Sequence, residues 1–142
     1  MAGNFKKLLL RTCSYKGYGS GHLKRSILLA KKIIEIYGNN VELIIAIEGD
    51  EESFGIVKKS KIKYIKLPLG IKVEDEIENY FPKNIDILVL DLFDRNDSNE
   101  KEYKKVTDCL VTFLDMGGSS IYSDIIIYPQ LLPDSTKKSK DE

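Results

Sequence analysis

Residues 8–25 of this sequence, LLLRTCSYKGYGSGHLKR, decide the fold that we expect. The apolar run at 8–13 predicts a buried strand, and the glycine-rich residues 15–21 predict a loop. From residue 23 to 37 apolar residues recur at spacings of four, three, four and three, while charged residues take the other side, as an amphipathic helix requires. A strand that runs through such a loop into a helix predicts the first unit of a nucleotide-binding type of α/β domain.

The same alternation of strand and helix continues to residue 128. Gly38-Asn39-Asn40 is expected to end the first helix. Further strands are predicted at 41–47, 62–67, 85–90, 109–114 and 124–128, and further helices up to residue 60, at 73–80 and at 98–106. The run at 85–90 is almost wholly apolar, which is typical of a strand buried on both faces of a parallel sheet. We therefore predict an α/β fold, a Rossmann-like open parallel sheet over residues 1–132, with 8–13 and 85–90 as inner strands and a polar tail at 133–142.

The composition limits the classes of protein to consider. With 142 residues, of which 42% are hydrophobic, the chain can bury the core of one domain. Its 22 basic and 22 acidic residues balance, so we expect no binding of a long nucleic acid, whereas a small phosphorylated ligand needs only a local site. Cys13 and Cys109 are isolated, which favours buried reduced thiols. We find neither a signal peptide nor an apolar run of the roughly 20 residues of a membrane span, and we expect a cytoplasmic protein.

The loop after the first strand carries the strongest functional signal. Gly17, Gly19 and Gly21, with Ser20 between them, allow the backbone to approach a ligand, and the N–H groups at the helix start attract anions. The third glycine comes one residue too early for a dinucleotide fingerprint, and the sequence has no Gly-Lys-Ser or Gly-Lys-Thr. His22, the only histidine, lies where loop and helix meet. Two roles stay open for it: a structural histidine, or a neutral imidazole that acts as a base near pH 7.

Charged residues at other strand ends are expected to face the same rim as His22. Arg25 follows His22 by one helical turn and can pair with a phosphate or remain a solvated charge. The acids at the predicted strand ends are Glu48, Asp91, Asp94 and Asp115. Each can contact a ligand, cap a helix or lie on the surface. Residues 116–120, which include Gly117, form a second rim loop, for which a ligand contact and a plain turn are equally plausible.

The segment Gly19-Ser20-Gly21-His22-Leu23-Lys24-Arg25 resembles the G-x-G-H-x-x-R motif of the sugar-nucleotide hydrolase of pseudaminic acid biosynthesis and of related spore-coat polysaccharide proteins. It is also similar to the glycine-rich loop of the transferase that adds GlcNAc to the lipid-linked peptidoglycan precursor. Asp91-Leu92-Phe93-Asp94, and Leu114-Asp115 with Ser123-Asp124-Ile125-Ile126-Ile127, resemble later segments of that hydrolase. The resemblance implies the N-terminal half of a GT-B fold, which holds a UDP-sugar between two Rossmann-like domains, and it implies that His22 is the base that activates water.

Three functions stay open at this point. In the first, the chain is the N-terminal half of a GT-B enzyme of cell-surface glycan biosynthesis, a UDP-sugar hydrolase or glycosyltransferase, and is completed by a separate C-terminal-domain chain or by self-association. This implies Gly17, Gly19, Ser20, Gly21, Arg25, Asp91, Asp115 and Gly117 as substrate contacts, and we expect neither a metal nor another cofactor. In the second, the domain binds a sugar nucleotide or phosphate without turnover. In the third, it is an unrelated Rossmann-like enzyme that uses a mononucleotide.

Overall fold

In the computed structural model, residues 5–15, 21–92, 96–115 and 118–129 are described. Within these ranges the strands are β1 (Lys6–Ser14), β2 (Val41–Gly49), β3 (Tyr64–Leu67), β4 (Ile85–Asp91), β5 (Thr107–Phe113) and β6 (Ile125–Ile127). The helices are α1 (Gly21–Tyr37), the short 3-10 helix η2 (Gly38–Asn40), α2 (Glu51–Lys59), α3 (Val73–Asn79) and α4 (Asp97–Lys104). Strand and helix thus alternate as the sequence predicts.

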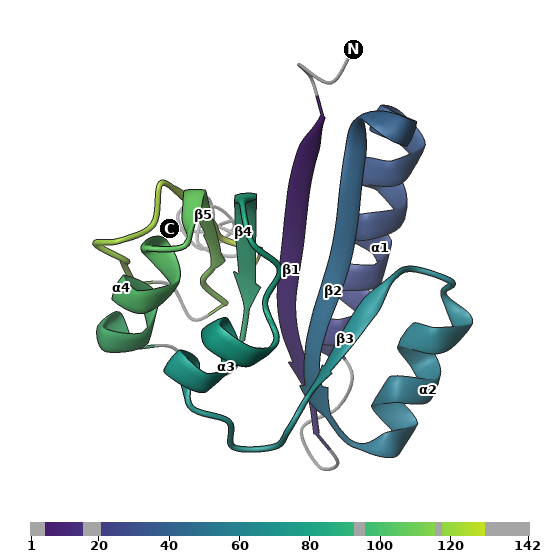
Figure 1. The fold of residues 1–142 in the computed structure, drawn as a ribbon, viewed down its shortest axis with the longest axis horizontal. Coiled ribbons are helices and arrows are strands. Elements are labelled where there is room, and N and C mark those ends of the chain that lie inside the picture. Colours follow the sequence, from purple (N-terminus) through teal and green to yellow (C-terminus); the bar gives the residue numbers. More distant parts are fainter. Residues whose placement is uncertain (1–4, 16–20, 93–95, 116–117, 130–142) are drawn as a thin grey trace, which may run out of the picture.

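The strands form one open sheet in which every neighbouring pair is parallel. Their order is β3-β2-β1-β4-β5-β6. Strands β1 and β4 are the inner pair, so the predicted Rossmann-like α/β sheet and its predicted centre are both confirmed. Helices α1 and α2 cover one face of the sheet, and α3 and α4 cover the other (Figure 1). The chain winds outward from β1 to β3 and then returns to β4, so the strand order reverses between β1 and β4, where ligands bind in open α/β sheets.

Two apolar clusters, one on each face, hold these layers together. Leu8 and Leu10 of β1 pack on the α1 face, whereas Leu9, between them in the sequence, packs on the α3 and α4 face. Successive side chains of a strand point to opposite faces, and β1 is buried on both. Cys13 is buried and Cys109 is partly buried, and both remain thiols.

At two positions the backbone geometry explains why the residue is glycine. Gly38 follows α1 with a φ of 52°, the left-handed conformation that commonly ends a helix, so its predicted role as helix stop is confirmed. Gly49 ends β2, and a Cβ atom there would lie 2.6 Å from the carbonyl oxygen of Ser14. Residue 49 must therefore be glycine if the ends of β1 and β2 are to approach this closely.

The predicted elements differ from the observed ones only at their ends. β3 starts at Tyr64 rather than at Ile62, because Lys61 has a φ of 63° and turns the chain out of α2. β5 starts at Thr107, two residues before the predicted start, because Thr107 pairs with Ile85 of β4. The predicted tail at 133–142 lies outside the described residues.

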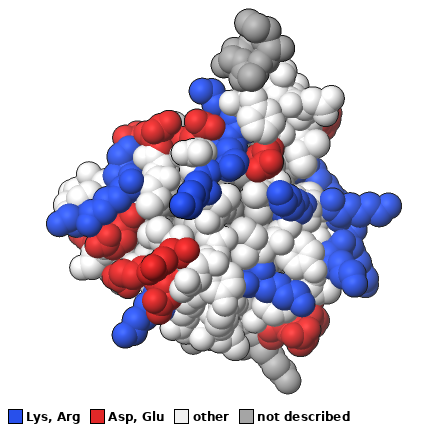
Figure 2. Space-filling model, viewed as in Figure 1, with Lys and Arg blue, Asp and Glu red and all other residues white. Residues whose placement is uncertain are grey.

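The charged side chains show no single dominant sign on the face that carries α3 and α4. Figure 2 shows acidic and basic groups interspersed there, as the balanced composition suggests. Among the described residues, the helices are too short or too polar to span a lipid bilayer.

Candidate functional site

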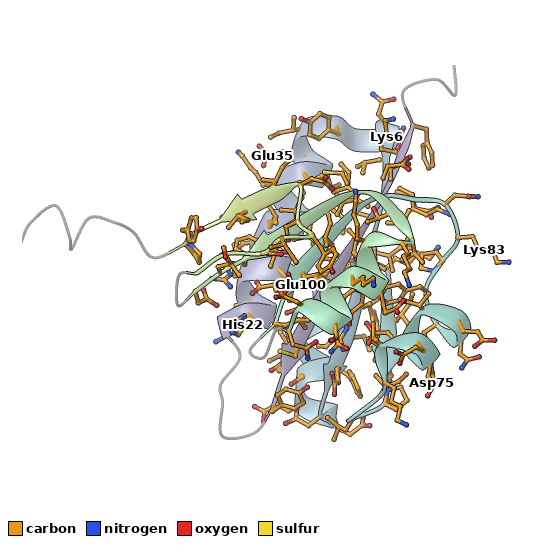
Figure 3. All side chains as sticks on the ribbon, turned by 90° about the vertical axis from the view of Figure 1, so that its left-hand side faces the viewer. Lys6, His22, Glu35, Asp75, Lys83 and Glu100 are labelled. Carbon is orange, nitrogen blue, oxygen red and sulfur yellow. The ribbon has the colours of Figure 1, made fainter. Side chains whose placement is uncertain are left out.

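Four of the predicted site residues meet at the carboxyl ends of the inner strands. His22 and Arg25 lie in the first two turns of α1, Asp91 is the last residue of β4, and Asp115 follows the end of β5. Figure 3 shows His22 at the start of α1, at the end of the molecule opposite Lys6, the first residue of β1. The predicted convergence of His22 with Asp91 and Asp115 is therefore observed.

A short contact in this cluster joins the imidazole to a carboxylate. Nδ1 of His22 lies 2.5 Å from Oδ1 of Asp91. Two acceptors would repel each other at this distance, so Nδ1 carries a proton and donates it to Asp91. In the neutral ring the lone pair then lies on Nε2, the atom that lies 3.7 Å from Oδ2 of Asp115. The side chain of Asp91 is 2% exposed and that of His22 is 11% exposed, so the pair is largely shielded from water.

Arg25 links the two carboxylates of the cluster. Its Nε donates to Oδ2 of Asp91 at 2.9 Å, its Nη1 donates to Oδ1 of Asp115 at 2.7 Å, and its Nη2 contacts both acids. The guanidinium also lies 4.5 Å from the ring centre of Phe113. In the structure, therefore, Arg25 orients two acids, and its predicted contact with a ligand phosphate stays a prediction.

The ion pairs shift the protonation of both partners. Burial alone would raise the pKa of Asp91, but the hydrogen bonds from His22 and Arg25 outweigh it, so this pKa lies below the ordinary value for aspartate. The hydrogen bond to Asp91, helped by the one to Asp115, raises the pKa of Arg25. Asp91 is therefore a carboxylate, and Arg25 a cation, throughout the physiological range.

Thr12 adds an unsatisfied polar group beside the cluster. It pairs in register with Asp91, so both side chains leave the sheet on the α1 face. Thr12 is 0% exposed, and Oγ1 has no hydrogen-bond partner among the described residues. Buried hydroxyl groups in native proteins are nearly always paired, so this one suits a water molecule or a ligand group at the same place.

A divalent cation is the other ligand to consider here. One donor atom each of His22, Asp91 and Asp115 lies within 4.8 Å of the others, as three ligands of one ion would. Arg25, however, already holds oxygen atoms of both carboxylates, and a cation there would face the guanidinium charge. The residues fit a metal ion poorly unless Arg25 moves away.

Glu48 lies at the same rim, near the end of β2, but it faces the other side of the sheet and does not join this cluster. Its neighbour Ile47 packs on the α1 face, so alternation turns Glu48 to the face that carries α3 and α4. There its Oε1 accepts a hydrogen bond from Nη2 of Arg11 at 2.8 Å, and its Oε2 accepts one from the Gly70 amide. These bonds outweigh burial and lower the pKa of Glu48.

The remaining predicted residues belong to the two loops, except for Asp94, which follows β4 in the sequence. Gly17, Gly19, Ser20, Asp94 and Gly117 lie outside the described residues. Gly21 begins α1, and a Cβ atom there would meet open space, so the fold itself does not require glycine at this position. In the second rim loop, Gly118 has a φ of 90°, a conformation that favours glycine and fits a turn.

Sequence reasoning missed a second polar group on the opposite face. Arg11 is 3% exposed, and it donates from Nε to Oε1 of Glu76 at 2.6 Å. The hydroxyl of Tyr103 donates to the same carboxylate oxygen at 2.9 Å. The available signal was the single arginine in the apolar strand LLLRTC, because a charge buried in a strand needs a partner.

No family model matches the chain, and no curated protein or solved structure is significantly similar to it. The fold is shown by its own topology, and the predicted kinship with the GT-B enzymes rests on the motif from Gly19 to Arg25.

Proposed function

We propose that this domain binds a sugar nucleotide at the reversal point between β1 and β4, and that His22 acts there as a general base. The hydrogen bond from Nδ1 of His22 to Asp91 carries the proposal, because it fixes the ring at a place where Rossmann-like folds bind ligands. The motif around His22 favours a UDP-sugar hydrolase or glycosyltransferase-like enzyme of cell-surface glycan biosynthesis, of which this chain forms the N-terminal half.

The chemistry follows from the tautomer. With Nδ1 donating to Asp91, Nε2 can accept a proton from a water molecule or a sugar hydroxyl. The imidazolium that forms is then stabilised by Asp91 and by Asp115, whose Oδ2 lies 3.7 Å from Nε2. A carboxylate that orients histidine and stabilises its charged form has the same role in hydrolases of unrelated fold.

The charge of the cluster decides which part of the ligand lies next to it. Asp91 and Asp115 contribute two negative charges and Arg25 one positive charge, so this cluster suits a hydroxyl donor better than a phosphate. The diphosphate is better placed at the N-terminus of α1, where backbone N–H groups and the helix dipole attract anions. Gly21 supports this placement, since the open space above it allows a ligand to approach the backbone.

The direct test is a calorimetric titration of the chain with UDP and with a panel of UDP-sugars. We expect weak binding of UDP-sugars, because a GT-B ligand is held between two domains and this chain supplies one face of the cleft. A complex with UDP alone of micromolar affinity or better would contradict the half-domain proposal, and the absence of any binding would contradict sugar-nucleotide binding altogether.

Turnover separates an enzyme from a binding module. We expect UDP release from a UDP-sugar when the chain is combined with the product of a neighbouring reading frame that encodes a second α/β domain. Binding that persists without turnover in that mixture would identify a non-catalytic sugar-nucleotide module. Turnover by the chain alone on a nucleotide without a sugar would instead identify an unrelated mononucleotide enzyme.

A further inference from the structure

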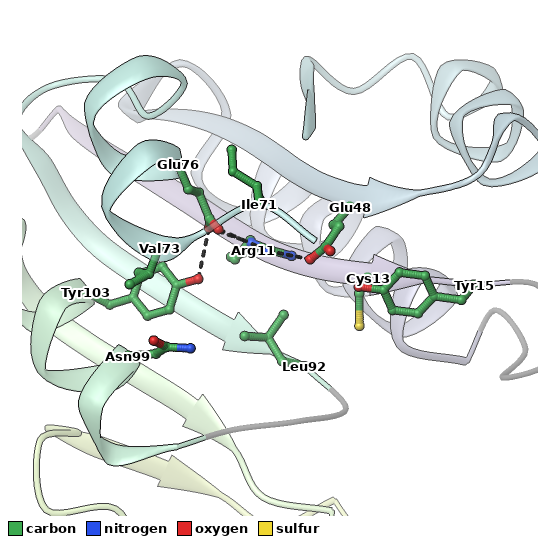
Figure 4. Close-up of a pocket in the computed structure, with 10 residues that line it drawn as sticks. All are labelled: Arg11, Cys13, Tyr15, Glu48, Ile71, Val73, Glu76, Leu92, Asn99 and Tyr103. Carbon is green, nitrogen blue, oxygen red and sulfur yellow. Dashed lines mark hydrogen bonds and ion pairs between the residues drawn. The ribbon is translucent and has the colours of Figure 1, made fainter. Parts of the chain in front are cut away.

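A polar cavity of about 220 Å³ lies on the face of the sheet opposite His22, between the last residues of β1 and β2 and helices α3 and α4 (Figure 4). Its lining combines basic, acidic, phenolic, thiol, amide and apolar groups: Arg11, Cys13, Tyr15, Glu48, Ile71, Val73, Glu76, Leu92, Asn99 and Tyr103. Leu92 directly follows Asp91, so the cavity and the His22 cluster share the rim where the strand order reverses.

The charged groups of the cavity are held in fixed positions. Arg11 donates to Glu76 from Nε and Nη2, to Glu48 from Nη2 and to the Thr12 carbonyl from Nη1. Burial alone would lower the pKa of Arg11, but the bonds to Glu76 and Glu48 outweigh it and raise this pKa. Two carboxylates face one guanidinium that is already paired, so the cavity disfavours a phosphate or another anion.

The same lining favours a carbohydrate ring over a metal ion. Carboxylate oxygens and the amide of Asn99 match the hydroxyl groups at the edge of a sugar, while Ile71, Val73 and Leu92 match its C–H faces. A strongly hydrated cation would gain nothing from this apolar wall, and Arg11 already serves as the cation for both acids. A volume of about 220 Å³ is below the roughly 300 to 1,000 Å³ of typical ligand pockets, which suits one ring better than a whole nucleotide.

We propose that this cavity is the subsite for the monosaccharide ring of the ligand, with the Glu48 and Glu76 carboxylates and the Asn99 amide as partners for its hydroxyl groups. The assignment rests on the proposed function in so far as the ring belongs to a sugar nucleotide whose diphosphate lies at the start of α1. In this arrangement the α3 and α4 face selects the sugar ring, and His22 on the α1 face acts on a water molecule and not on a hydroxyl of that ring.

The test uses Asn99→Ala, because Asn99 is exposed at the cavity mouth and its side chain belongs to no ion pair of the described structure. Loss of one net hydrogen bond weakens an affinity by about five-fold. We therefore expect Asn99→Ala to bind UDP-glucose or UDP-N-acetylglucosamine about five-fold more weakly than the wild type, and UDP equally well. The matched control is Asn40→Ala, an exposed asparagine in η2 at the opposite end of β2, which should change neither affinity.

A second variant fills the cavity instead of removing one contact. Ile71→Trp places a large side chain at the partly buried lining position 71 and should abolish the advantage of the UDP-sugar over UDP, with the thermal melt reporting that the domain stays folded. Equal UDP-sugar affinity in wild type, Asn99→Ala and Ile71→Trp would overturn the subsite while leaving UDP binding, and so the proposed function, intact.

Free monosaccharides at high concentration make the test independent of the nucleotide. We expect glucose or N-acetylglucosamine to shift the methyl NMR signals of Val73 and Leu92, and Ile71→Trp to remove the shift. Absence of these shifts in the wild type would overturn the subsite whatever UDP does, and shifts produced by magnesium chloride instead would assign the cavity to a cation. If the sugars shift the signals but neither UDP nor UDP-sugars bind, the subsite holds and the proposed function fails.

Discussion

Replacing Asp91 with asparagine tests the structure of the His22 cluster most sharply, because the change keeps the size of the side chain and removes its charge. Asp91 is 2% exposed and contacts both His22 and Arg25. Breaking a buried ion pair by removing one partner costs about 3 to 5 kcal/mol. Arg25 is 28% exposed and keeps Asp115, so we expect the lower end, about 3 kcal/mol. For a domain of this size that loss lowers the melting temperature by roughly 10 °C.

Thermal and urea unfolding of wild type and Asp91→Asn measure this loss. Glu102→Gln is the matched control, since it makes the same carboxylate-to-amide change in a pair with Lys105 at 3.0 Å, where the side chains are 32% and 58% exposed. Exposed pairs of this kind contribute little, so we expect a change within about 0.5 kcal/mol. Equal melting temperatures of Asp91→Asn and Glu102→Gln would refute this, because loss of the charge of a buried carboxylate that binds two partners must cost more stability than loss of an exposed one.

Three further predictions concern acid stability, the glycines and the base. Because the pKa of Asp91 is lowered on folding, the Asp91 carboxylate contributes its full share of the unfolding free energy above about pH 5, and this share is lost as the pH falls below 3.8. The unfolding free energies of wild type and Asp91→Asn should therefore converge only in that acid range. Gly49→Ala should destabilise the domain by about 2 kcal/mol or more, since its Cβ would meet the Ser14 carbonyl oxygen. Gly21→Ala should not lower the melting temperature, because its Cβ would meet open space, but it should weaken UDP-sugar binding. Equal melting temperatures of the two variants would contradict this. In the complex of this chain with its proposed partner domain, His22→Ala should lower turnover by about 10²-fold or more and leave the fold and the UDP-sugar affinity nearly unchanged. A variant that unfolds, or one whose turnover rate is unchanged, would instead indicate a structural histidine.

The layers of the fold could be predicted because each apolar run has a length and period of its own. The run at 85–90 indicated a strand buried on both faces, and it became an inner strand beside β1. The ends of the elements depend on pairing and on single turns, which no local pattern records. Lys61, for example, adopts a positive φ although it is not a glycine, so the predicted start of β3 came two residues early.

The sequence predicted which residues lie at the carboxyl-end rim of the sheet, but not which face of the sheet each of them points to. The rule that strands of a parallel sheet end at one edge brought His22, Asp91 and Asp115 together correctly. The same rule placed Glu48 with them, although alternation from Ile47 turns it to the other face, where it meets Arg11. Alternation counted from the apolar residues of each strand separates the two faces and corrects this error.

The sequence could not predict which groups the charged side chains of the site bind. Arg25 has the charge and the position to bind a phosphate, and in the structure it binds two carboxylates from distant strand ends. Such a choice depends on distances across β4 and β5, which come from tertiary packing and not from spacing along one helix.

The central claim is that His22, oriented by Asp91, is a base within a sugar-nucleotide site. His22 is the only histidine, so in a protein without a histidine tag the ¹⁵N NMR spectrum of the imidazole reports on this side chain alone. We expect the neutral ring to be protonated at Nδ1, this preference to weaken in Asp91→Asn, and the Nε2 signal to move when a UDP-sugar is added. A ring protonated at Nε2, or an Nε2 signal that stays unchanged at saturating UDP-sugar, would contradict the claim.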